Sequence, residues 1–245
     1  KDPRHEILKI YSHGLMTMKL FVEDLKRGIR PKYSKIKRLC LKLMQMEIKY
    51  QNLMLAVIQI HSVKGQLYAH ILNTAILCLI FARRVGLSSA QTLNLGMTAF
   101  YQNLSWALVD KVHPDAQGIN LETIQEIETF RGEHQDSIQV IRNHISHLLL
   151  MIGGFNTSVI NRLIVAYETQ VVNDDDVTDL YFADIDVNLL TEVVVMASIY
   201  DRLSVLDEAG REVRTDEIVK AILEDGGDRN PFLAQLFASA LGSYP

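Results

Sequence analysis

Two apolar helical segments joined by a short turn constrain the fold of this chain more than any other feature. They cover residues 66–84 and 88–106. Gly86 stands where a left-handed helix C-cap is expected, and Ser88 with Gln91 has the spacing of a capping box. Both segments are apolar enough to be buried. The pattern therefore predicts two neighbouring core helices with a short connection.

Each of these segments carries polar side chains on its apolar background. His70 and Asn73 lie in the first segment, and Gln102 and Asn103 lie near the end of the second. Because buried polar groups cost free energy unless they are paired, several of them in one core indicate a site. We expect a polar network of His70, Gln102 and Asn103, which Asp201 from a later segment can join.

The rest of the chain also has helical periodicity. Apolar residues recur at helical spacing over residues 4–26, and a longer segment from Ser34 to Ser62 has an apolar stripe with a lysine-rich back. The pattern does not decide whether this helix is interrupted near Gln51-Asn52. These segments predict N-terminal helices whose apolar stripe is large enough to support a homodimer.

The C-terminal part also contains helix signals. Residues 189–203 form an apolar helical pattern, Gly226-Gly227 predicts a helix end, and Asn230-Pro231 predicts the start of the last helix. Together with the preceding segments, these signals predict an all-α fold.

The order of these segments resembles the HD-GYP domain, the cyclic di-GMP phosphodiesterase branch of the HD phosphohydrolase superfamily. His70 matches the His that opens the family's first helix, residues 82–88 match its "lar.lGls" segment, and residues 189–203 match its "aRilavaDvyDaL" helix. The resemblance implies an HD-domain helical bundle over residues 63–245 with an N-terminal helical extension over residues 1–62.

Most metal ligands that the resemblance implies are replaced. The family's His-Asp pair falls on Gln102 and Asn103, and the Lys that follows it falls on Trp106. A later His is matched by His134. Amide side chains bind transition metals poorly compared with imidazole and carboxylate groups.

The second half of the implied site is altered in the same way. The family's His-His-Glu falls on residues 166–168, with Tyr167 at the second His, and an acidic segment, residues 173–179, replaces the Gly-Tyr-Pro loop. Ser198 replaces a ligand Asp, while Asp201 matches a second Asp that is kept. We therefore expect a degenerate site without a metal or other cofactor.

The charge is distributed unevenly along the chain. Residues 1–64 contain 14 basic and 5 acidic side chains, residues 65–170 contain 6 and 8, and residues 171–245 contain 5 and 16. The basic and acidic regions could face each other in a dimer, or they could be solvated helix faces. The basic region lacks interleaved surface aromatics and a nucleic-acid-binding motif, which argues against nucleic acid as a partner.

The resemblance and the lost ligands together favour a pseudoenzyme: an inactive HD-GYP-like signalling module of a bacterial cyclic-dinucleotide pathway that binds another signalling or scaffold protein. A cyclic di-GMP sensor that does not hydrolyse its ligand ranks second, with Arg211 and Arg214 as the candidate phosphate-binding residues. A divergent metal-dependent phosphodiesterase ranks third.

The sequence also carries information on the compartment. Its two cysteines, Cys40 and Cys78, lie in apolar helical patterns, which is typical of a reducing compartment. No signal peptide and no membrane span are evident, so we expect a cytoplasmic location. Because the chain begins at Lys1 rather than Met, we expect it to be a region of a longer protein.

Overall fold

The structure is a computed structural model, and it describes residues 2–59, 65–109, 121–133, 147–148, 157–172, 188–204 and 213–241. In this part of the chain the regular elements are helices, accompanied by one isolated antiparallel bridge between Gln66 and Thr123. The predicted all-α fold is confirmed. The helices are α1 (Pro3–Lys26), α2 (Tyr33–Val57), α3 (Leu67–Arg84), α4 (Ser89–Tyr101), the 3₁₀ helix η2 (Leu104–Leu108), α6 (Ile124–Glu133), α8 (Thr157–Val172), α10 (Leu189–Leu203), α11 (Thr215–Arg229) and α12 (Pro231–Ala240).

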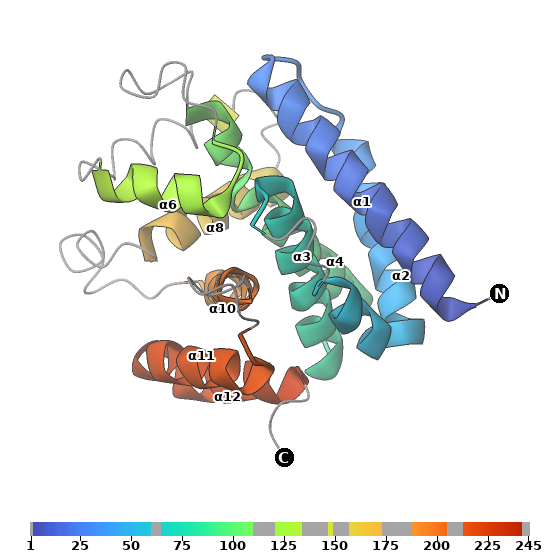
Figure 1. Cartoon of the computed structure of the whole chain (residues 1–245), viewed down its shortest axis with the longest axis vertical. Helices are drawn as coiled ribbons and strands as arrows, with labels where there is room; N and C mark the ends of the chain where they lie inside the picture. The colour runs from blue at the N-terminus through green and yellow to red at the C-terminus, as the bar shows by residue number, and fades with distance from the viewer. Residues whose placement is uncertain are drawn as a thin grey trace.

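Helix α3 is the centre of the molecule. It packs against α1, α2, α4, α10 and α12, and Figure 1 shows α1 and α2 along one side of it. Among the described helices, α3 alone has the length and hydropathy of a membrane span, but 83% of it is buried inside the protein. A helix that is apolar all round and covered by neighbours is typical of a core helix.

The predicted connection between α3 and α4 is confirmed. Gly86 has a φ of +75°, a backbone conformation that favours glycine. The Ser88 hydroxyl accepts from the Gln91 amide, and the Gln91 side chain accepts from the Ser88 amide, which completes the capping box. Gly96 then lets α4 pack closely, because a Cβ there would lie 2.7 Å from Leu79 Cδ2 and 2.8 Å from Cys40 Sγ.

The two N-terminal helices share the core of the rest of the chain. One continuous cluster of buried apolar side chains extends from Ile7 in α1 to Leu241. Helix α2 is kinked at Tyr50 (φ −145°, ψ 40°), next to the break that the sequence left open. The division into residues 1–62 and 63–245 stays a prediction. Large apolar side chains exposed on α1, α2 and the turn between them are Leu8, Met16, Leu20, Ile29, Leu41 and Ile48.

One predicted helix end is wrong. Helix α11 continues through Gly226-Gly227 to Arg229 instead of ending at the glycines. Glycine inside a helix costs only about 1 kcal/mol relative to alanine, whereas Pro231 disfavours helical geometry at the residue before it. Asn230 accordingly leaves the helix and caps α12, as predicted, by accepting from the Leu233 amide.

Candidate functional site

The polar site lies where α3 faces α10. His70 and Asn73 are three residues apart on α3, and Ser198 and Asp201 are three residues apart on α10. This spacing places each pair on one face of its helix. All four side chains are buried, with exposed fractions of 1–9%. The structure thus brings His70 together with both residues that the sequence singled out on the later helix.

These side chains form a chain of short hydrogen bonds. His70 Nδ1 lies 2.7 Å from Asp201 Oδ2, and Asn73 Nδ2 donates to Asp201 Oδ1 at 2.7 Å. His70 Nε2 lies 3.0 Å from Ser198 Oγ. A carboxylate can only accept, so Nδ1 carries the hydrogen; in the neutral ring, Nε2 then accepts from the Ser198 hydroxyl.

Tyr11 of α1 completes the network, and the sequence alone did not identify it. Its hydroxyl donates to Asn73 Oδ1 at 2.9 Å, and its ring is 2% exposed. Burial, and then the nearby Asp201 carboxylate, raise the pKa of Tyr11 well above its ordinary value. The phenol therefore stays a hydrogen donor. The sequence analysis did not single out Tyr11, and only its contact with Asn73 reveals its role.

The remaining predicted residues fall in different places. Gln102 and Asn103 are both buried at the junction of α4 and η2. Tyr167 is half-buried on α8. His134 and Arg211 lie outside the described residues. The exposed Arg214 donates to both carboxylate oxygens of Asp216, each at 3.0 Å.

Glu168, the family's carboxylate on α8, has a structural role here. It accepts from the Thr191 hydroxyl, and at 3.3 Å from the backbone amide of Asn188. Asn188 is the N-cap of α10 and Thr191 lies in its first turn, where a negative charge is favourable. Glu168 therefore fastens α8 to the beginning of α10.

The described residues of the site do not fit a divalent metal ion. Both ring nitrogens of His70 and both oxygens of Asp201 are already engaged within the network. Ser198 contributes a neutral hydroxyl, and Gln102 and Asn103 contribute neutral amides. Across the described ranges, no three His, Cys, Asp or Glu side chains cluster closely enough to hold a metal. Transition metals prefer imidazole, thiolate and carboxylate groups with free lone pairs.

The order Ser198, His70, Asp201 is that of a nucleophile, a base and an orienting carboxylate. The surroundings do not suit this chemistry. Ser198 is 9% exposed and lies in the middle of α10. The amides that follow it in a helix are bonded to carbonyls four residues earlier, so they cannot form an oxyanion hole. The geometry holds two helices together rather than activating a nucleophile.

Comparison with known proteins agrees with the fold. No protein-family model matches the sequence, and no curated protein matches it. Among solved structures, Bd1817, an HDG"Y"P protein from Bdellovibrio bacteriovorus, superposes with a TM-score of 0.63 at 16% sequence identity. The match covers 99% of this chain and 73% of Bd1817. This chain therefore shares the fold of that HDG"Y"P protein.

Proposed function

We propose that this chain is a catalytically inactive HD-GYP-like signalling module that acts by binding another protein. The observation that carries the proposal is the closed network of His70, Asp201, Asn73, Ser198 and Tyr11. In it His70 and Ser198, which stand where the resemblance implies metal ligands, are used for a hydrogen bond between helices. Hydrolysis of a phosphodiester in HD enzymes depends on metal ions that activate water and neutralise phosphate charge.

Two further observations argue against binding of a nucleotide. Trp106, which stands at the position of the family's Lys, is only 2% exposed and presents no cation to a phosphate. Arg214 is already paired with Asp216. The expected partner is a signalling or scaffold protein in the bacterial cytoplasm, with a homodimer through α1 and α2 as part of the same proposal.

Metal analysis combined with calorimetry tests the proposal. The purified chain, after incubation with manganese or iron and gel filtration, is expected to retain far less than one metal ion per chain. Cyclic di-GMP is expected to give no isotherm with a Kd below about 100 μM, which corresponds to about −5.5 kcal/mol. About one tightly bound metal per chain would reject the inactive module, and a micromolar isotherm would favour the cyclic di-GMP sensor.

A further inference from the structure

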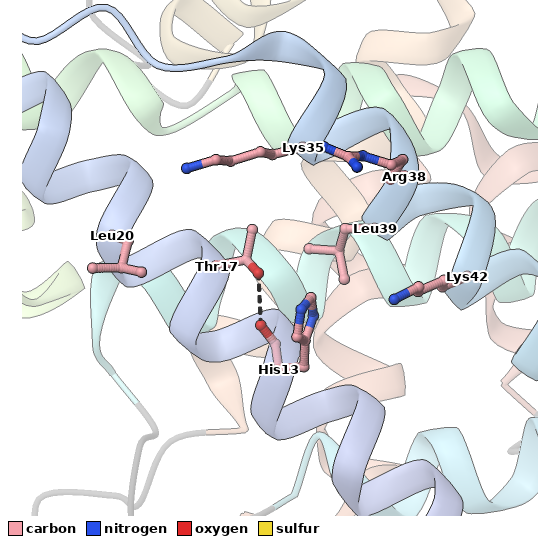
Figure 2. Close-up of a pocket in the computed structure, with 7 residues that line it drawn as sticks. All are labelled: His13, Thr17, Leu20, Lys35, Arg38, Leu39 and Lys42. Carbon is pink, nitrogen blue, oxygen red and sulfur yellow. Dashed lines mark hydrogen bonds between the residues drawn. The ribbon is translucent and has the colours of Figure 1, made fainter.

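A groove with a cationic wall runs between α1 and α2, away from the buried network. It encloses about 310 Å³ and is lined by His13, Thr17 and Leu20 on α1 and by Lys35, Arg38, Leu39 and Lys42 on α2. Figure 2 shows the Lys35 and Lys42 side chains reaching from α2 toward α1, with Leu39 between them. A groove between two helices suits an elongated ligand.

The three cations form a row along α2. Lys35, Arg38 and Lys42 follow one another at intervals of three and four residues, so they share one side of the helix over about 10 Å. None of the described residues that line the groove carries a carboxylate. Arg38 Nε donates to the Ser34 carbonyl at 3.2 Å, and within the described ranges none of the three cations forms an ion pair. The three cations thus place positive charge along this wall of the groove.

The rest of the groove is apolar. Leu39 is 1% exposed and forms the floor, while Leu20 on the α1 side is 47% exposed. Met16, one turn before Leu20 on α1, is 58% exposed. The Thr17 hydroxyl donates to the His13 carbonyl at 2.7 Å, so its hydrogen is already bonded within α1 and needs no acceptor from a ligand. The groove thus combines a cationic wall with an apolar floor and rim.

We propose that this groove is the docking site for an acidic amphipathic helix of a protein partner. Carboxylates at intervals of three and four residues match Lys35, Arg38 and Lys42, and an apolar residue between them packs on Leu20 and Leu39. This is the helix-in-groove mode of recognition. The inference rests on the proposed function, for which it supplies the surface and the class of partner.

The layout of the groove favours a helix over other anions. A compact phosphate is held by donors that converge on one point, whereas these cations are spread along a row. Single-stranded nucleic acid stacks its bases on aromatic side chains, and the described lining of this groove contains no Phe, Tyr or Trp.

Peptide binding to the whole chain tests the inference. The probe is a fluorescently labelled helical peptide of about 15 residues with Glu and Leu at the matching spacing, and the reference probe replaces each Glu with Gln. Anisotropy titrations at about 150 mM NaCl compare the wild type with the groove variant Lys35→Glu/Arg38→Glu/Lys42→Glu. The control variant Lys9→Glu/Lys37→Glu/Lys49→Glu makes the same change in net charge at exposed lysines outside the groove.

The groove variant is expected to bind the Glu peptide at least about tenfold more weakly than the wild type, because three attractive contacts become repulsive. The control variant should change affinity less than about twofold, and the Gln peptide should bind at least about tenfold more weakly. Equal binding of both peptides by the wild type, or equal loss in both variants, would overturn the inference. The comparison of the two peptides uses the wild-type chain alone, so it does not depend on whether a variant folds.

Failure of this inference can be separated from failure of the proposed function. Metal content and phosphodiesterase turnover report on the buried site, whereas the peptide reports on the groove. A metal-free, inactive chain that ignores the peptide rejects the groove alone. A chain that binds the peptide and also hydrolyses cyclic di-GMP rejects the proposed function alone.

Discussion

Replacing Asp201 with alanine tests whether the buried network fastens α3 to α10. Asp201 accepts one hydrogen bond from His70 and one from Asn73, each at 2.7 Å, and is 5% exposed. A hydrogen bond to a charged group contributes about 1.5–3 kcal/mol, and its loss here leaves two buried donors without an acceptor. We therefore expect Asp201→Ala to lower the free energy of unfolding by about 3–5 kcal/mol.

Asp201→Asn should cost less, about 1–2 kcal/mol, because the network can rearrange around it. The Asn oxygen can accept from Asn73 while its amide donates to His70 Nδ1. The ring then carries its hydrogen on Nε2 and donates to Ser198. This exchange of tautomer keeps every hydrogen bond but removes the charge, and the nitrogen chemical shifts of His70 would report it.

Equilibrium urea unfolding and thermal melting measure both variants. For a domain of this size, the alanine variant should melt about 6–20 °C below the wild type. Asp216→Ala is the matched control, because Asp216 also accepts from two donor nitrogens but its side chain is 63% exposed. Its cost should stay below about 0.5 kcal/mol. An alanine variant at Asp201 within 1 kcal/mol of the wild type would refute the reasoning.

Three further predictions concern other residues. Burial raises the pKa of the Glu47 carboxyl to about 7, although Arg83 and Arg84 at the end of α3 act to lower it. The contribution of Glu47 to the free energy of unfolding is therefore fully present below about pH 4.5 and is lost as the pH rises through 7. Glu47→Gln should accordingly gain stability relative to the wild type over that interval, by up to about 3 kcal/mol, and urea midpoints that differ equally at pH 4.5 and 8 would contradict it. Ser198 should not react with a fluorophosphonate probe, since it lies buried mid-helix; mass spectrometry showing its modification would restore the nucleophile interpretation. The variant Gln102→His/Asn103→Asp should not gain metal-dependent phosphodiesterase activity, because His70 and Asp201 remain hydrogen-bonded to each other. Turnover in that variant would show that the ligand assignment is wrong.

The central helices were predictable because their signals are local. Gly86 and the Ser88–Gln91 box are read from neighbouring residues, and the structure contains both. The end of α11 was not, since two glycines suggested a stop that the cap at Asn230 overrides. Local patterns locate a helix boundary reliably only when one strong signal stands alone.

The candidate site was predictable in part. The resemblance placed Ser198 and Asp201 in the same degenerate site as His70, and the structure brings the three together. Tyr11 could not be found in this way, because it is 62 residues from Asn73 and its contribution depends on how α1 packs on α3. The role of Glu168 was hidden for the same reason, since a cap on α10 supplied from α8 leaves no mark in the local sequence.

Hydrolysis of cyclic di-GMP is the most direct test of our central proposal, which is that this chain has no phosphodiesterase activity. The whole chain is incubated anaerobically with the dinucleotide and excess Mn²⁺ or Fe²⁺, and the linear dinucleotide and GMP are quantified by liquid chromatography. The network around His70 predicts that product forms no faster than in a sample treated with EDTA. Metal-dependent turnover that EDTA abolishes would contradict it.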